Sequence, residues 1–153
     1  GGPLAAVFMG HVGQNLAGDG SGVSFVLRSG WNINPNQGVV TEFEQRGWQQ
    51  LVEQAEHRSG NSESAEDFET YWEEGELDDG TPVNRVMIPD LASAKSCVEC
   101  HNRLEQTPEV LAMRGRKPAT QFAQGDLIGA VVTTVPLATS SALAAQCAQT
   151  QSD

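Results

Sequence analysis

The sequence predicts an α+β domain in which an antiparallel sheet is flanked by helices. Helical periodicity covers only about half of the chain, which is too little for an all-helical fold. Two strand-like segments are separated by the turn signal Asp79-Gly80, and they predict a β-hairpin. No internal repeat and no linker divides the chain. Residues 1–153 are therefore expected to form one domain, with a C-terminal helix or tail over 139–153.

The first third of the chain is expected to supply two helices and a strand. In residues 3–16 apolar side chains recur at three- and four-residue spacing, which is typical of an amphipathic helix. Residues 23–27 are rich in Val and Phe and are bounded by glycines, which favours a strand. Thr41 and Glu44 match a capping box, so a second helix is expected over 41–57.

The remainder of the chain is expected to contain the hairpin and the most apolar strand. The hairpin strands are predicted over 68–74 and 82–88, with Pro89 ending the second. Further along, the pattern predicts a short helix over 105–113, a strand over 127–137 and an Ala-rich helix over 140–149.

The run Cys97-Val98-Glu99-Cys100-His101 has the form C-x-x-C-H, which attaches a haem covalently. Two thiols at this spacing add across the two vinyl groups of one porphyrin, and the histidine after the second thiol is then held under the iron. A thioredoxin-like dithiol does not need a histidine there. A zinc site needs a second group of ligands, whereas the other cysteine and histidines, Cys147, His11 and His57, are isolated. We therefore predict haem c on Cys97 and Cys100, with His101 as the proximal iron ligand.

The chain is strongly acidic, with 20 acidic and 9 basic residues and a formal net charge of −11. Nucleic acid is therefore not an expected partner. Between Glu63 and Asp79 there are nine acidic residues and no Lys or Arg. Such a run is either a solvated face that keeps the protein soluble or a docking surface for a basic electron-transfer partner.

The haem motif also predicts a location. Haem is attached to such motifs outside the cytoplasm, so the protein is expected in a periplasm, a thylakoid lumen or on a cell surface. The chain opens Gly1-Gly2-Pro3 without the pattern of a signal peptide, and we interpret it as processed or truncated there. No apolar stretch approaches the roughly 20 residues that span a bilayer, so no transmembrane segment is expected. Cys147 is left single and is expected to be incidental.

Three stretches resemble the PAS-like c-type haem domain family, which contains exported or membrane-tethered bacterial and cyanobacterial proteins. They are Gly1-Gly-Pro-Leu-Ala-Ala-Val7, Ser96-Cys-Val-Glu-Cys-His101 and Gly125-Asp-Leu-Ile-Gly-Ala-Val-Val132. The resemblance covers about residues 1–138. It implies an antiparallel sheet flanked by helices with haem c between them, and a role in electron transfer or redox sensing.

The resemblance also bears on the second axial ligand of the iron. Family members often have a cysteine in the first helix shortly after Gly-Gly-Pro, where this chain has Gly10, which cannot bind iron. His11 is therefore predicted as the distal ligand, with Met9 as the alternative. The remaining candidates are Met87, Met113, His57 and water, although Met87 is more typical of a core residue and His57 of a helix end. A second histidine gives a six-coordinate iron, a methionine raises the potential, and an open position admits a gas.

For the other residues around the cofactor, the sequence indicates only two groups of candidates, aromatic and basic side chains. The aromatic candidates for lining a pocket are Trp31, Trp48, Trp72, Tyr71, Phe25 and Phe43. The candidates for pairing with haem propionates are Arg85, Lys95 and Arg103. No catalytic triad, phosphate loop or carboxylate pair is recognisable, so an enzyme is not expected.

The sequence thus predicts a monohaem c-type cytochrome domain that transfers or stores one electron. Its expected partner is a redox protein, as in an accessory subunit of a membrane electron-transfer or photosynthetic complex. The alternative is a haem-based redox or gas sensor input domain.

Overall fold

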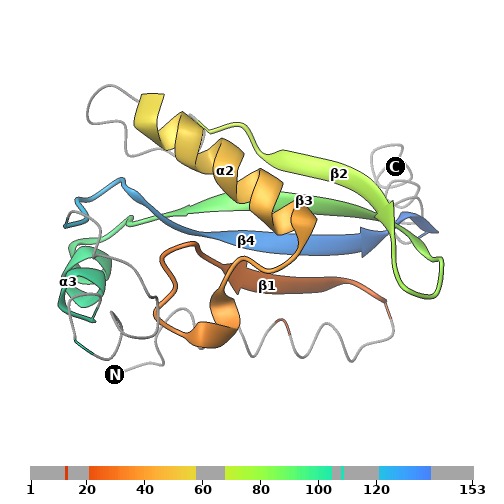
Figure 1. Cartoon of the computed structure of the whole chain (residues 1–153), viewed down its shortest axis with the longest axis horizontal. Coiled ribbons are helices and arrows are strands. Elements are labelled where there is room, and N and C mark those ends of the chain that lie inside the picture. Colours follow the sequence, from red (N-terminus) through yellow and green to blue (C-terminus); the bar gives the residue numbers. More distant parts are fainter. Residues whose placement is uncertain (1–12, 14–20, 58–67, 105–107, 109–120, 139–153) are drawn as a thin grey trace, which may run out of the picture. The chain divides into compact units, whose positions relative to one another are not determined.

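The computed structural model describes residues 13, 21–57, 68–104, 108 and 121–138. Their elements, in chain order, are β1 (Ser24–Arg28), η1 (Pro35–Gln37), α2 (Glu42–His57), β2 (Tyr71–Glu76), β3 (Pro82–Leu91), α3 (Lys95–Leu104) and β4 (Leu127–Pro136). The strands form one four-stranded antiparallel sheet in the order β1-β4-β3-β2 (Figure 1). The α+β prediction is confirmed, and the predicted strands and the 41–57 helix are present within a few residues of their expected bounds.

The β2–β3 hairpin closes where the Asp79-Gly80 signal predicts. Leu77 N donates to Thr81 O and Gly80 N donates to Leu77 O, both at 2.9 Å. The Asp79 carboxylate accepts from Thr81 N at 2.9 Å. Gly80 has a φ of +82°, in the left-handed region that glycine adopts without strain. This is a tight turn followed by a glycine bulge, a common hairpin connection.

The prediction that Pro89 ends the second hairpin strand is wrong, because β3 continues to Leu91. The bond between Leu77 N and Thr81 O sets a register in which Met87 lies opposite Tyr71, the first residue of β2. Pro89 therefore lies beyond the end of β2. In an antiparallel sheet, successive residues of a central strand direct their backbone hydrogen bonds in turn to one neighbouring strand and then to the other. Pro89 is directed toward the β2 side, where β2 no longer runs beside it. Its missing N–H removes no ladder bond there.

The predicted capping box starts α2. Glu44 N donates to Thr41 Oγ1 at 3.2 Å, and Glu44 Oε2 accepts from Thr41 N at 3.0 Å and from Val40 N at 2.8 Å. The other carboxylate oxygen, Oε1, accepts from Arg28 Nε at 2.7 Å, which ties the helix start to β1. Burial alone raises the pKa of the Glu44 carboxyl, but the Arg28 and backbone hydrogen bonds outweigh it, and the pKa is lowered.

Under α2 lies a tightly packed core. Leu51 and Met87 are fully buried. Gly47 lets the helix approach the sheet, because a Cβ there would lie 2.7 Å from the Tyr71 ring and 2.9 Å from Met87 Sδ. Phe43 packs on Tyr71 with ring centroids 5.4 Å apart. Met87 is thus a core residue of this layer.

The described contacts group the chain into two compact units. One unit comprises 27–71 and 87–131 and contains α2 and α3. The other comprises 1–26, 72–86 and 132–153 and contains the hairpin turn. Within the described ranges, no helix is long and apolar enough to cross a membrane. That residues 1–153 form one domain stays a prediction. Apart from residue 108, the helices expected over 105–113 and 140–149 lie outside the described residues.

Candidate functional site

The C-x-x-C-H run lies within α3 rather than before a helix. The sequence predicts the helix only from residue 105, whereas α3 spans Lys95–Leu104. Cys97 N and Val98 N both donate to Ala94 O, which opens the first turn. Lys95 Nζ lies 3.8 Å from Glu99 Oε1, one turn apart along the exposed side. The four-residue spacing of Lys95 and Glu99 could have indicated this helix from the sequence. The helix was missed because the Cys and His residues interrupt the apolar pattern of its partly buried side.

Helix geometry gathers the three motif side chains on one side of α3. With about 100° of rotation per residue, Cys97, Cys100 and His101 fall within a stripe about 100° wide. Both thiols are free and half-buried, and His101 is half-buried too. No residue of α3 is fully buried. The helix therefore offers a stripe of two thiols and an imidazole that the described chain covers only in part.

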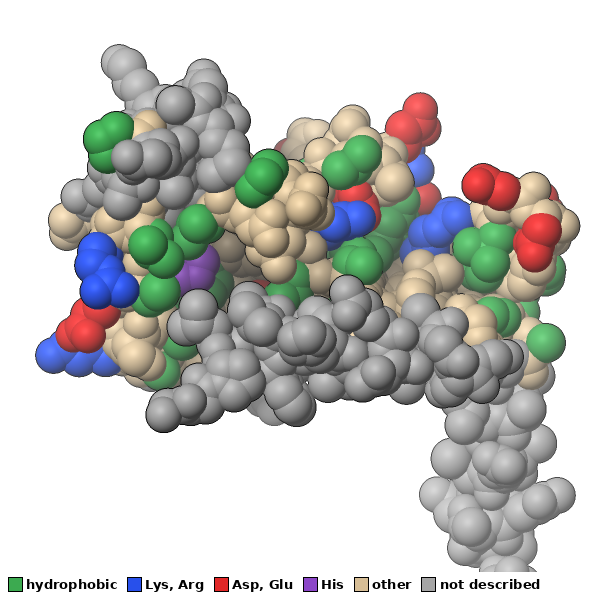
Figure 2. All heavy atoms as spheres, turned by 90° about the horizontal axis from the view of Figure 1, so that it is seen from below, with side chains coloured by type: hydrophobic (Ala, Val, Ile, Leu, Met, Phe, Trp, Pro, Cys, Tyr) green, Lys and Arg blue, Asp and Glu red, His purple; other side chains and the backbone are tan. Residues whose placement is uncertain are grey.

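An apolar cluster packs against this helix. Its buried members are Ala92, Phe122 and Ile128, and Trp31, Cys97 and Val98 pack against them. The Phe122 ring meets the His101 ring edge-on, with centroids 5.9 Å apart and planes at 87°. Figure 2 shows a histidine side chain set among hydrophobic side chains. Such surroundings suit a large planar hydrophobic group held against an imidazole.

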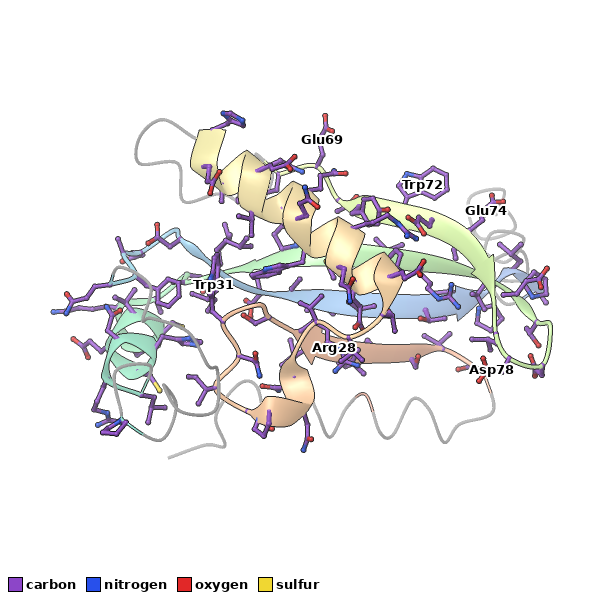
Figure 3. The ribbon with its side chains drawn as sticks, viewed as in Figure 1. Arg28, Trp31, Glu69, Trp72, Glu74 and Asp78 are labelled. Carbon is purple, nitrogen blue, oxygen red and sulfur yellow. The ribbon has the colours of Figure 1, made fainter. Side chains whose placement is uncertain are left out.

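The aromatic contacts continue from Phe122 to α2. Trp31 lies 5.9 Å from Phe122 and 4.9 Å from Trp48 between ring centroids, edge-on in both cases. The Ser29 hydroxyl accepts from Trp31 N and donates to Ile128 O, both at 2.9 Å. These two bonds fix the backbone of Trp31, just after the end of β1, relative to β4. Figure 3 shows Trp31 at the end of the sheet beside α3. Four rings, from His101 to Trp48, are thus in sequential contact.

The segment that carries Phe122 is held to α3 by one side chain. Asn102 Nδ2 donates to Phe122 O at 2.9 Å, and Asn102 Oδ1 accepts from Phe122 N at 2.7 Å. The same segment then turns into β4 at Gly125, which has a φ of +88°. Asp126 Oδ2 accepts from Ala123 N at 2.7 Å and closes this turn. The Gly-Asp pair before β4 therefore shapes the loop that presents Phe122.

One aromatic residue of the site, Phe122, was missed from the sequence. Phe122 was not among the aromatic candidates, although it is the only aromatic residue between the motif and the Gly125-Asp126 turn. Asp90 is half-buried at the end of β3, between the buried Pro89 and Leu91. Burial raises the pKa of the Asp90 carboxyl, and the charge of His101 opposes the rise.

The other candidates that the sequence predicted lie in several separate parts of the structure. Of the aromatic residues, Trp31 and Trp48 lie in the site, Phe43 and Tyr71 pack beneath α2, and Trp72 is 61% exposed. His57 is exposed in the last turn of α2. Lys95 and Arg103 are exposed on α3, and Arg85 donates to Glu76 O at 2.7 Å beside the hairpin. Met9, His11, Met113 and Cys147 lie outside the described residues.

Nothing in the described ranges forms a metal site from protein ligands alone, since no three His, Cys, Asp or Glu side chains gather there. A haem iron does not require such a group, because the porphyrin supplies four nitrogens and the protein only the axial ligands. The residues present fit that requirement: a single imidazole, two adjacent thiols and an apolar wall.

The fold and the site together define an α+β domain with a four-stranded antiparallel sheet, in which a helix carries a C-x-x-C-H run beside an apolar cluster. The chain belongs to the Tll0287-like family, whose sequence profile matches residues 4–136. Among solved structures, the crystal structure of the cyanobacterial haem protein Tll0287 matches with a TM-score of 0.57 and 17% identity, covering 88% of this chain and 73% of that one. At this identity the likeness shows the fold. A comparison with curated proteins gives no match.

Proposed function

We propose that this protein binds one haem c through Cys97 and Cys100, with His101 as the proximal iron ligand. The observation that carries the proposal is the stripe of two free thiols and one imidazole on α3, half-buried against Phe122 and its cluster. Membership of a family that includes a haem protein supports it. Each thiol adds across a vinyl double bond, its sulfur to one carbon and its hydrogen to the other, so no oxidant is needed.

The surrounding residues would control the environment of the haem. Phe122, Ile128 and Ala92 are buried and apolar, so they exclude water from the side of α3 that carries the motif. Asn102 holds Phe122 against His101 and so limits rotation of the imidazole. The bound haem supplies a one-electron couple, and its potential depends on the axial ligands and on the burial of the site.

The role we propose is to transfer or store one electron outside the cytoplasm, for a redox partner protein. The described hairpin carries acidic residues and an exposed Trp72, which suit a partner with a basic surface. A membrane electron-transfer or photosynthetic complex is the proposed setting. We propose no enzymatic reaction. His11 is the proposed distal ligand, with Met9 as the alternative.

Haem attachment is tested by denaturing electrophoresis with a haem stain, after expression with the machinery that matures c-type cytochromes. The wild-type band should stain, and Cys97→Ala/Cys100→Ala should not. Cys147→Ala is the matched control, because it removes a thiol outside the motif and should leave the stain unchanged. A wild-type protein that loses its colour to acid acetone contradicts the proposal.

A haem-based redox or gas sensor is the second candidate, favoured by the PAS-like family assignment. It differs from a carrier in having an iron that accepts an external ligand. The reduced protein would then bind CO at once, whereas the iron of a six-coordinate carrier would bind it only slowly or not at all. The CO difference spectrum of the reduced wild-type protein separates the two.

A further inference from the structure

β2 is an edge strand of the sheet, because it comes last in the strand order β1-β4-β3-β2. The bond from Leu77 N to Thr81 O directs the backbone of Leu77 toward β3. In an antiparallel ladder the residues of a strand alternate in this direction, so every second residue of β2 points its N–H and C=O groups away from β3. These residues are Trp72, Glu74 and Glu76, and their backbone groups form the open edge of the sheet.

Among the described residues, only one of these edge groups has a hydrogen-bond partner. The Arg85 guanidinium donates to Glu76 O at 2.7 Å. It passes over Gly75, because a Cβ on that glycine would overlap Arg85 Nη1. Successive side chains of a strand leave it on opposite faces, so the guanidinium lies on the face opposite the Glu76 side chain. Arg85 thus covers one carbonyl at the end of the edge and leaves the backbone groups of Trp72 and Glu74 open.

The same three residues present an exposed row of side chains. Trp72, Glu74 and Glu76 are exposed and alternate with half-buried residues along β2. Figure 3 shows Trp72 and Glu74 pointing away from the ribbon. Trp72 is 61% exposed, although tryptophan is usually largely buried, and tryptophan is enriched where proteins bind one another. No described residue pairs with this indole or with the two carboxylates, so the row is available to a partner.

The charge of the hairpin determines which chain can pair with this edge. Residues 72–84 contain five acidic residues and no Lys or Arg. Pairing β2 with β2 of a second copy would bring the Glu74 and Glu76 carboxylates of the two copies together, and like charges on adjacent strands are destabilising. A strand with Lys or Arg would instead place opposite charges side by side. The edge is therefore protected against a second copy and open to a basic strand.

We propose that an extended basic segment of a partner protein adds to the sheet as a further strand beside β2. Backbone bonds to Trp72 and Glu74 hold the segment. Its Lys or Arg side chains pair with Glu74 and Glu76, and the stem or the charge of one of them packs on the Trp72 ring. The inference describes how the partner binds, and it rests on the proposed function for that partner being a redox protein.

The test measures, by fluorescence anisotropy, how tightly the haem-loaded full chain binds a labelled peptide of alternating lysine and threonine. Glu74→Gln/Glu76→Gln should weaken binding about tenfold, because two exposed ion pairs are lost. Trp72→Ala should weaken it about fivefold. The same peptide with methylated backbone nitrogens keeps its charges but has no N–H donors for the edge, and it should bind at least about tenfold more weakly.

Glu42→Gln/Glu56→Gln is the matched control, because it removes two exposed carboxylates from α2 and none from β2. It should change the affinity less than about twofold. A control as weak as Glu74→Gln/Glu76→Gln overturns the inference, as does a methylated peptide that binds as tightly as the unmethylated one. A wild type that does not bind the peptide, or that forms a dimer which excludes it, overturns it too. A wild type that binds the peptide but carries no haem overturns only the proposed function.

Discussion

The side-chain amide of Asn102 pairs with the backbone of Phe122 in both directions, at 2.9 Å and 2.7 Å. The two residues are 20 positions apart in the sequence. Asn102 directly follows the histidine of the motif, and the ring of Phe122 contacts that histidine. One amide thus connects the motif helix to the loop that forms its apolar wall.

Asn102→Ala should destabilise the chain by about 1–3 kcal/mol, because both polar backbone groups of Phe122 lose their partner while half-buried. Urea unfolding followed by circular dichroism measures the change. Arg103→Ala, at the next position but exposed, should change the free energy of unfolding by less than about 0.5 kcal/mol. Equal effects of the two substitutions would mean that the Asn102 amide does not hold the loop.

Gly30→Ala should disturb the Trp31–Trp48 contact. A Cβ on Gly30 would overlap the indole nitrogen of Trp48 and lie 2.8 Å from its Cε2. The ring must move, and overpacking of this kind costs about 1–3 kcal/mol. Tryptophan fluorescence and thermal unfolding should both change. Gly38→Ala is the control, since a Cβ there meets only ordinary contacts at 3.7 Å, and its spectrum should match wild type.

Glu44 should make the stability of the fold depend on pH. Its pKa is lowered below the ordinary value of 4.5 in the folded chain. Its ionised form therefore stabilises the fold fully above the unfolded pKa, and this contribution is lost as the pH falls through the folded pKa. Glu44→Gln should cost about 2 kcal/mol near neutral pH, and the difference from wild type should shrink in acid.

Urea unfolding at several pH values checks this dependence. Glu42→Gln is the control, because Glu42 is exposed and its pair with Arg46, at 3.4 Å, is of the surface kind that contributes about 0–1 kcal/mol. A Glu44→Gln deficit that stays constant from neutral to acidic pH would show that the loss comes from packing and not from the charge.

The parts of the fold that the sequence predicted depend on local chemistry. The Thr41–Glu44 capping box and the Asp79-Gly80 turn each act within a few residues, so their signals are complete in a short window. Pro89 was misjudged because its effect depends on where β2 ends, which is decided by the register of another strand. Local rules do not contain that information.

The residues of the site can likewise be divided into those with a local sequence signal and those that depend on the fold. Cys97, Cys100 and His101 were predicted because their spacing alone specifies the chemistry. Phe122 comes to α3 from a segment 20 positions away, and the Asn102 pairing holds it there. Phe122 belongs to no motif, so its contact with His101 does not follow from the sequence.

His11→Ala tests the proposed distal ligand. If His11 closes the sixth position, this variant should convert the reduced haem from low-spin to a high-spin form that binds CO. Met9→Leu and His57→Ala should leave the absorption spectrum unchanged, since His57 is exposed at the end of α2. An unaltered low-spin spectrum in His11→Ala would instead move the assignment to a methionine.

The mass of the denatured, intact chain tests covalent attachment. Unfolding releases a haem held only by packing or by the iron, whereas thioether bonds to Cys97 and Cys100 survive it. We expect the wild-type mass to exceed the polypeptide mass by one haem, with Cys147→Ala retaining the increment and Cys97→Ala/Cys100→Ala losing it. A coloured wild-type protein whose denatured mass is that of the polypeptide alone would contradict haem c at this site.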